Sequence, residues 1–374
     1  MTVRHYLDHA STSPLRPEAR EALAAWLDGA GFGDPSRVHE SGLDARHLVE
    51  GAREQVAALL GCRGRSVVFT SGATEAIAAA CWGAAERGDH QVVAAVEHSA
   101  VRSSAEQHGP VTVVGVDGSG RVDPDAVLAA IGPGTAAVHL QWANHEVGTR
   151  QPVAEVVAAC RERGVLVHVD AAVGAGHDPI AFDELGADLL SVSGHKVGGP
   201  PGSGALLVRR GVRLRPLLVG GDQERARRAG MEAVPGVAGF GAVCAWLAEP
   251  GRLQQEASHQ RALTDRVLGG IGAADGLRVY GDPVDRVPHI ACLGFDDVEP
   301  QAVLLGLDRA GIAVHSGSAC ASESLEPSPV LAAMGVDAHR SLRVSVGWNS
   351  TDADVDALLD ALPVVLRDLR ALRR

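Results

Sequence analysis

Short apolar runs alternate with helical periodicity from about residue 40 to residue 210, and this alternation constrains the fold of the chain more than any other feature. In one unit, Pro152 suits a first helical turn, apolar residues recur at helical spacing from Val153 to Cys160, and an apolar run follows at 165–169. Comparable runs occur at 67–70, 92–96, 111–116, 136–142, 189–192 and 205–208. Repeated strand and helix units predict an α/β protein with a mostly parallel, seven-stranded sheet covered by helices.

The pattern changes after about residue 250. A long polar helix leads to strands near 277–280, 289–295 and 342–346, and a terminal helix begins at about Asp352. This order predicts a smaller α+β domain. We expect a large domain at 15–250 and a small domain formed by 1–14 and 251–374. No internal repeat or Pro/Gly linker separates the two, so we expect them to pack closely.

Composition narrows the choice of partners. The formal net charge of -12 argues against a sequence-independent nucleic-acid binder or a binder of anionic membranes, because both need a basic face. Residues 1–6 lack an apolar signal core, and the sequence has no apolar stretch of membrane-spanning length, so we expect a cytoplasmic protein without membrane contact. The six cysteines include no Cys-x-x-Cys pair, which favours reduced thiols over disulfides or a metal site.

Lys196 is the chain's one lysine among thirty-four basic residues, and it stands in Ser-Gly-His-Lys directly after an apolar run. An arginine guanidinium keeps its proton under ordinary conditions, whereas a desolvated lysine amine can act as a nucleophile. The pattern therefore indicates a reactive amine at Lys196. The alternative is that compositional drift towards arginine left one lysine by chance.

A turn suited to binding phosphate spans Ser71-Gly72-Ala73-Thr74-Glu75 between a predicted strand and an alanine-rich helix. Glycine lets the backbone approach a ligand, the helix start presents free N–H groups, and Ser/Thr hydroxyls add donors. The same residues also fit an ordinary capping box. This segment alone supports a capping box about as well as a phosphate site.

Three further polar side chains follow predicted strands. Asp170 ends one strand, Lys196 follows the next, and His98 follows a third. Ligands of open α/β sheets bind beyond the carboxyl ends of the strands, so these groups should meet. An amine, an acid and a phosphate turn together fit pyridoxal phosphate, which needs a covalent lysine, an acid at the pyridine nitrogen and a phosphate cradle. His98 would stack on the ring, or else only cap a strand end.

The order of the motifs resembles that of NifS-type cysteine desulfurases, in the class V aminotransferase family of fold type I. The resemblance covers nearly the whole chain. It is carried by Ser-Gly-Ala-Thr-Glu, Glu-His-Ser, Asn-His-Glu-Val-Gly, His-Val-Asp-Ala, Ser-Gly-His-Lys and Ser-Gly-Ser-Ala-Cys, in that order. The opening segment 6–12, the segment 32–36 and the segment 325–328 are also similar to the family.

The resemblance implies a homodimeric, pyridoxal phosphate-dependent enzyme that removes sulfur from L-cysteine and leaves alanine. Lys196 would hold the cofactor and move protons, Asp170 would pair with the pyridine nitrogen, and His98 would stack on the ring. The phosphate contacts implied are Ala73, Thr74, Ser193 and His195. Asn144 and His145 would lie at the ring's phenolic oxygen, and Asn144 and Arg343 would bind substrate, the latter through its bidentate fork.

Cys320 lies in a small, polar segment at 315–322 and matches the family's sulfur-accepting nucleophile. Its thiolate would take the substrate sulfur as a persulfide and pass it to an acceptor protein, so exposure and mobility are both needed. The acceptor stays open between an iron-sulfur cluster scaffold and other thiolation pathways. The alternative is an incidental exposed thiol.

Three positions depart from the family. His145 stands where a second Asn is usual, Val173 where a Gln is usual, and Met231 where a Thr reaches the phosphate across the dimer interface. These changes keep two other readings open: a selenocysteine lyase-like enzyme, and a catalytically impaired scaffold. The seven arginines of 209–228 match a segment near the partner subunit, although a solvated basic face is as well supported.

Overall fold

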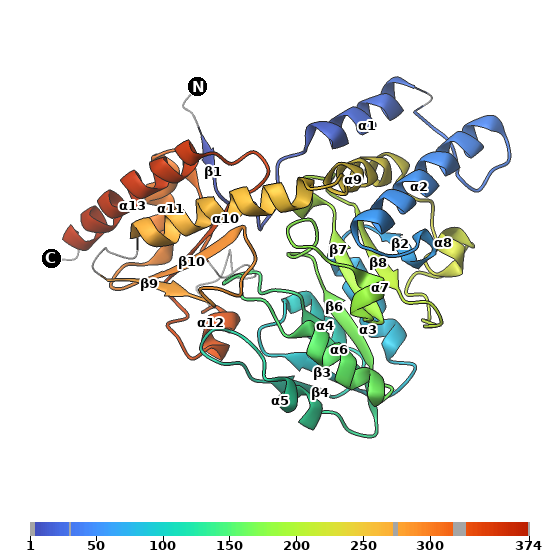
Figure 1. Ribbon diagram of the computed structural model, residues 1–374, viewed down its shortest axis with the longest axis horizontal. Helices are drawn as coiled ribbons and strands as arrows, with labels where there is room; N and C mark the ends of the chain where they lie inside the picture. The colour runs from blue at the N-terminus through green and yellow to red at the C-terminus, as the bar shows by residue number, and fades with distance from the viewer. Residues whose placement is uncertain (1–3, 30, 272–275, 317–326, 373–374) are drawn as a thin grey trace.

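The computed structural model describes residues 4–29, 31–271, 276–316 and 327–372 (Figure 1). Within these ranges the strands form a seven-stranded, a three-stranded and a two-stranded sheet. The large sheet has, in spatial order, β2 (Val67–Thr70), β8 (Gly204–Val208), β7 (Leu189–Ser193), β6 (Leu166–Asp170), β5 (Thr135–Gln141), β3 (His90–Ala94) and β4 (Val111–Val114). β8 is antiparallel to both neighbours and every other pair is parallel, which confirms the predicted mostly parallel sheet.

Helices cover both faces of this sheet, so its central strands are buried along their whole length. The helices of this part are α1 (Pro17–Asp28), α2 (Glu40–Leu59), α3 (Ala73–Ala84), α4 (Ser99–Glu106), α5 (Pro124–Ala129), α6 (Val153–Glu162), α7 (Phe182–Leu185), α8 (Gln223–Ala226) and α9 (Val234–Leu247). The packing of α2 on α9 depends on Gly241, where an added Cβ would lie 2.5 Å from the Cβ of Ala52. A larger residue at Gly241 would push the two helices apart.

The C-terminal part has its own core. Its antiparallel sheet has the order β12 (Ser341–Ser345), β10 (Ile290–Phe295), β9 (Leu277–Tyr280), and its helices are α10 (Arg252–Ile271), α11 (Pro300–Arg309), α12 (Pro329–Ala333) and α13 (Asp352–Ala371). The N-terminal strand β1 (His5–Tyr6) pairs with β11 (Ile312–Ala313), and Leu7 is buried in this second core. Figure 1 shows α10 extending from α9 across to this part.

From this arrangement we propose a large domain at 15–250 and a small domain at 1–14 and 251–374. Tyr280, Cys292 and Leu331, which belong to the small domain by these limits, pack into the core cluster of the large sheet. The two parts therefore share a packed boundary. Among the described residues, the structure has no helix that is both long and apolar enough to cross a membrane.

Buried histidines make the stability of the fold depend on pH. Those with lowered pKa values and little exposure are His9, His139, His145, His168, His177 and His289. Burial lowers the pKa of His9 to about 3 and that of His139 to about 4. An unfolded histidine titrates near 6.5, so the unfolded chain binds more protons than the folded chain between these values. Stability is therefore lost as pH falls below about 6.5.

We expect the free energy of unfolding to fall by at least about 3 kcal/mol between pH 6.5 and pH 5, since each buried histidine contributes about 1.4 kcal/mol per pH unit. Two buried glutamates act in the opposite direction, because burial raises the pKa of Glu97 well above its ordinary value and that of Glu146 to about 7. The histidines outnumber them. Urea unfolding followed by circular dichroism at both pH values measures the effect, and equal stability at pH 5 and 6.5 would contradict it.

Candidate active site

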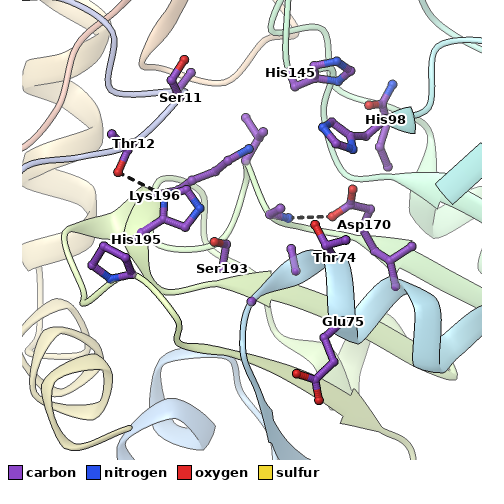
Figure 2. A pocket seen from close by; sticks show the side chains of 18 of the residues that line it. Ser11, Thr12, Thr74, Glu75, His98, His145, Asp170, Ser193, His195 and Lys196 are labelled. Atoms are coloured by element: carbon purple, nitrogen blue, oxygen red, sulfur yellow. Dashed lines mark hydrogen bonds between the residues drawn. The ribbon is translucent and has the colours of Figure 1, made fainter. Parts of the chain in front are cut away.

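A cavity of about 630 Å³ opens at the carboxyl edge of the large sheet (Figure 2). Gln141, Asp170 and Ser193 are the last residues of β5, β6 and β7, and all three line it. The turn after β2, the residue His98 beyond β3, and the N-terminal residues 10–12 complete its wall. Parallel strands thus bring to one edge the polar groups that the sequence placed after separate strands.

The turn at Ser71–Glu75 does not form the capping box that its sequence allowed, because Gly72 is the N-cap of α3 and supplies no side-chain hydrogen bond. Gly72 has φ 152°, a conformation that L side chains rarely adopt, and α3 begins directly after it. Glu75 accepts a hydrogen bond from the backbone N of Ser71 at 2.8 Å, and Figure 2 shows its carboxylate directed away from Asp170 and Lys196. Thr74 lines the cavity at the helix start, where anions bind favourably.

Arg228 pairs with the carboxylate of Glu75, which itself lines the cavity. Its Nε donates to Glu75 Oε1 at 2.8 Å. Burial opposes ionisation of Glu75, but hydrogen bonds from Arg228 and Ser71 outweigh it and lower the pKa of this carboxyl. Glu75 is therefore an anion that is neutralised by its own partners, and it leaves the helix start available for a ligand.

Lys196 lies in the short 3₁₀ turn His195–Val197 that follows β7. Its side chain is half-buried and lines the cavity between the N-terminal segment and Asp170 (Figure 2). The hydroxyl of Ser193 is buried and has no hydrogen-bond partner within the described ranges. His195 Nδ1 lies 3.1 Å from Thr12 Oγ1, and burial together with the charge of Lys196 lowers the pKa of His195. The turn thus offers an amine, an unsatisfied hydroxyl and an uncharged imidazole.

Asp170 is buried, and one of its carboxylate oxygens is already engaged. Oδ1 accepts hydrogen bonds from the backbone N of Ala172 at 3.0 Å and from Ser191 Oγ at 3.2 Å. Ser191 lies on the neighbouring strand β7, whereas Ala172 follows β6 and lines the cavity together with Asp170. The carboxylate is therefore anchored through Oδ1 at the cavity wall.

His98 serves as a helix cap and as a cavity wall at once. Its Nδ1 accepts a hydrogen bond from the backbone N of Ala100 at 3.1 Å at the start of α4. Its ring meets that of His145 edge to face, with centroids 5.2 Å apart. Burial, reinforced by the positive charge of Lys196, lowers the pKa of His98. An uncharged ring at this wall can stack on a planar ligand.

His145 also has a buried, uncharged ring. Burial places its pKa well below the ordinary value, and the positive charges of Lys196 and Arg343 act in the same direction. Its Nδ1 is buried and has no hydrogen-bond partner among the described residues. Such an orphaned polar atom in a cavity wall is costly unless a ligand or water completes it.

Asn144 differs from expectation, because it does not line the cavity. Its Oδ1 accepts hydrogen bonds from the backbone N atoms of Glu146 and Val147, both at 2.9 Å, and its Nδ2 donates to Val96 O at 3.2 Å. These bonds use both lone pairs of Oδ1 and one of the two N–H groups of Nδ2 in shaping the turn. The structure therefore places Asn144 behind the site, where it supports the backbone of His145.

Arg343 lines the cavity from β12, yet only 1% of it is exposed. Nη1 donates to His145 O at 2.9 Å, and Nη2 donates to Asp8 Oδ1 at 2.9 Å and to Ser11 Oγ at 2.6 Å. Its Nε is buried without a partner in the described part of the chain. The guanidinium is thus preorganised by Asp8, and a carboxylate that binds it must share or replace that contact.

Several wall residues were not identified as site residues from the sequence. Ser11 and Thr12 come from the N-terminal segment, and Gln141 ends β5, where its Nε2 donates to Val96 O. The segment 6–12 had been noted for its resemblance to the family, and that was the available signal for Ser11 and Thr12. Gln141 lies at the end of a predicted apolar run, so only its position at the sheet edge identifies it.

The three departures from the family occupy different surroundings. Val173 is 6% exposed and packs in an apolar cluster with Ala10, Ala143, Val287 and Ile290. His145 stands across from His98, whereas the Met231 side chain is 56% exposed. Cys320 lies outside the described residues.

The arginines of segment 209–228 mostly contact their own chain. Arg209 pairs with Asp188, Arg215 stacks 3.3 Å from the ring centroid of Trp82, and Arg228 pairs with Glu75. Arg225 pairs with Glu50 at 3.0 Å, and Arg227 donates to backbone carbonyls near β2. This segment is therefore fastened to the large domain and is not simply a solvated basic face.

The mostly parallel sheet and the cavity at its carboxyl edge define an open α/β protein, the class whose ligands bind at that edge. Within this class the chain belongs to the aminotransferase class-V family, whose sequence pattern matches residues 5–358.

Relatives with known names agree over nearly the full length. The chain is 42% identical to a cysteine desulfurase of Gluconacetobacter diazotrophicus, over 98% of this chain and 94% of the relative. It is 38% identical to the cysteine desulfurase IscS 1 of Archaeoglobus fulgidus, over 98% of each chain.

Solved structures give the same result. A NifS-like protein matches with a TM-score of 0.91 and 30% identity, covering 98% of this chain and 100% of that chain. A structure of SspA in complex with cysteine matches with a TM-score of 0.80 and 27% identity, covering 92% and 99%. These similarities confirm the predicted fold class and the resemblance to NifS-type proteins.

Proposed function

We propose that this chain is a pyridoxal phosphate-dependent cysteine desulfurase, which converts L-cysteine to L-alanine and transfers the sulfur to Cys320. The observation that carries the proposal is the position of Lys196. The one lysine of the sequence lines a cavity that also holds a buried carboxylate, Asp170, and the start of α3. The full-length similarity to proteins named cysteine desulfurase supports the same substrate.

The residues of the cavity fit pyridoxal phosphate. The orphaned hydroxyl of Ser193 and the free helix start at Ala73 and Thr74 suit a phosphate group, and His195 stands beside them. The orphaned Nδ1 of His145 offers a polar partner for the ring side of the cofactor. Pyridoxal phosphate, once bound, supplies an electron sink for breaking bonds at the substrate's carbon atoms.

The protein's own groups then have separate tasks. Lys196 holds the cofactor covalently and carries protons to and from the substrate. Asp170 accepts a hydrogen bond from the protonated pyridine nitrogen, and its anchored Oδ1 keeps it in place. His98, uncharged because it is buried and lies near Lys196, stacks on the ring without placing a second cation beside the amine.

Arg343 binds the carboxylate of the substrate. Its fork is oriented in advance by Asp8 and Ser11, so little side-chain entropy is lost when the substrate arrives. Asp8 then faces the incoming carboxylate across the guanidinium.

Cys320 accepts the sulfur and presents it to an acceptor protein, and the assembly is a homodimer, as the resemblance implies. A thiolate at Cys320 would attack the substrate sulfur, so that the S–S bond of the persulfide forms as the substrate C–S bond breaks. The electron pair of the broken bond stays with the substrate carbon, and a proton added there leaves alanine as the organic product. The small, polar residues around it in the sequence suit a thiol that must meet both substrate and acceptor. A scaffold for iron-sulfur clusters is one acceptor of the expected kind.

Borohydride reduction followed by peptide mass spectrometry tests the cofactor assignment. The reduced protein should carry the pyridoxyl label on Lys196, and an unlabelled Lys196 peptide would overturn the proposal. After addition of L-cysteine, the unreduced protein should release alanine and show one extra sulfur on Cys320.

The two alternative functions, a selenocysteine lyase-like enzyme and a catalytically impaired scaffold, predict different results. Unchanged turnover by Cys320→Ala would favour a direct lyase of the selenocysteine lyase kind. Failure to show a near-visible absorption band after addition of pyridoxal phosphate would favour a scaffold without catalysis.

Val173→Gln tests the departure at that position. The change buries an amide in an apolar cluster, so we expect the cofactor-free protein to lose about 1–3 kcal/mol of unfolding free energy. Bound cofactor should reduce this deficit, because its phenolic oxygen can accept from the new amide. Val173→Leu is the matched apolar control, for which cofactor should make no difference. An equal deficit for Val173→Gln with and without cofactor would show that the amide does not reach the ring.

A further inference from the structure

A row of polar side chains crosses the otherwise apolar large sheet behind Asp170. Gln91, His139, His168 and Ser191 lie on four neighbouring strands, β3, β5, β6 and β7, and each is at most 1% exposed. The strand register places His139 opposite His168 and Ser191 opposite Asp170. His168 and Asp170 are two residues apart, so their side chains point to the same face.

The row is a continuous chain of hydrogen bonds that ends on Asp170. His139 Nε2 lies 2.7 Å from Oε1 of Gln91, and His139 Nδ1 lies 3.0 Å from His168 Nδ1. His168 Nε2 lies 3.2 Å from Ser191 Oγ, which lies 3.2 Å from Asp170 Oδ1. Burial lowers the pKa of both histidines, that of His139 to about 4, so each ring is neutral and carries one proton.

Neutral rings allow only one direction of donation when Asp170 is a carboxylate. An ionised carboxylate only accepts, so the single proton of Ser191 must point to Asp170. Ser191 must then accept from Nε2–H of His168, and Nδ1 of His168 must accept from Nδ1–H of His139. Nε2 of His139 must then accept, so this direction of donation requires the Gln91 amide to be turned end for end, with its NH2 group in place of Oε1 at this contact. If every hydrogen bond in this row ran in the opposite direction, Asp170 would have to carry a proton and donate it to Ser191.

We propose that Ser191, His168 and His139 are positioning residues that hold Asp170 as an acceptor for the ring nitrogen of the cofactor. This inference rests on the proposed function, because it assigns a protonated pyridine nitrogen to Asp170. A protonated ring nitrogen needs Asp170 as a carboxylate, because only that form can accept its hydrogen bond. The row of hydrogen bonds from Gln91 to Asp170 is complete when Asp170 is a carboxylate. The row thereby favours a pyridine ring over an aromatic ring that lacks the nitrogen.

Comparing the binding of two ligands distinguishes a loss of Asp170 positioning from general damage to the sheet. Pyridoxal phosphate and 1-deazapyridoxal phosphate differ by N–H against C–H at the atom that faces Asp170. We expect Ser191→Ala to weaken the binding of pyridoxal phosphate about tenfold or more, as for loss of a hydrogen bond to a charged group. Binding of the deaza compound should change less than about twofold. Ser191→Thr, which keeps the hydroxyl, should restore the preference for pyridoxal phosphate.

Thr264→Val is the matched control for losing a buried hydroxyl. Thr264 is 0% exposed, and its hydroxyl donates to Pro288 O in the small domain, away from the cavity. It should lower stability and leave the ratio of the two affinities unchanged. Equal weakening of both ligands by Ser191→Ala, or weakening of neither, would overturn the positioning role and leave the proposed function intact. Failure of the wild-type protein to bind pyridoxal phosphate would overturn both.

A second measurement, of the histidine tautomers, is made on the wild-type protein and needs no substitution in the core. In the wild-type protein loaded with pyridoxal phosphate, the ¹⁵N chemical shifts of the histidine rings should show His168 protonated at Nε2 and His139 protonated at Nδ1. Single substitutions at each position assign the signals. The opposite tautomers in the loaded protein would overturn the inference, even if Ser191→Ala failed to fold.

Discussion

Lys196→Arg abolishes the conversion of L-cysteine to alanine, with a rate loss on the order of 10⁴-fold or more. The substitution keeps a positive charge at the cavity, so the uncharged states of His98 and His195 beside it should be preserved. What it removes is the amine that can bond to an aldehyde and exchange a proton, which a guanidinium cannot do. Alanine release, together with absorption before and after borohydride, measures the loss.

An exposed lysine provides the matched control. Arg210 is exposed, so Arg210→Lys gives the chain a second amine in solvent. We expect this variant to keep wild-type turnover and to carry no pyridoxyl label at position 210. Combined with Lys196→Arg, it should not rescue activity. Retention of more than a tenth of the wild-type rate by Lys196→Arg would mean that Lys196 is not the reactive amine.

Glu224→Gln should destabilise the fold by about 3–5 kcal/mol, the cost of leaving a buried charge without its partner. Glu224 accepts hydrogen bonds at 2.7 Å from both Nη1 and Nη2 of Arg53, and at 2.9 Å from the backbone N of Phe69. Its side chain and that of Arg53 are 1% and 2% exposed. A glutamine amide keeps the shape but turns one acceptor into a donor that faces the guanidinium.

Glu50→Gln is the control, because Glu50 contacts the same guanidinium from a half-exposed position. An exposed ion pair contributes about 0–1 kcal/mol, so this variant should stay close to the wild type. Urea unfolding of both variants compares the two contacts directly. A loss below about 1 kcal/mol for Glu224→Gln would contradict the assigned importance of the buried pair.

The central strands of the large sheet could be predicted because they are buried on both faces. Such strands are continuous apolar runs, and all seven runs correspond to strands of the structure, with 67–70 matching β2 at both ends. Other limits shifted by one or two residues, as at β5, where Thr135 and Gln141 replace the expected ends. Strand ends depend on hydrogen bonding between neighbours, which an apolar pattern does not record.

The centre of the site could also be located from local signals. Lys196, Asp170 and the turn at Gly72 each follow a strand, and the geometry of a parallel sheet brings such positions together. Asn144 could not be assigned correctly in this way, since its motif does not reveal whether the amide faces the cavity or the backbone of Glu146. The choice depends on which backbone groups lie within reach.

The chemical groups of this protein, namely one amine, a carboxylate at a strand end and a turn that needs glycine, were determined by the sequence alone, because each is a local property of a few residues. Contacts between distant segments were decided only by the tertiary structure. Asp8 and Arg343 are 335 positions apart, and His139 meets His168 only through the register of β5 on β6. Residue type and spacing specify which chemistry is present, whereas the direction and burial of each group depend on neighbours that the folded chain supplies.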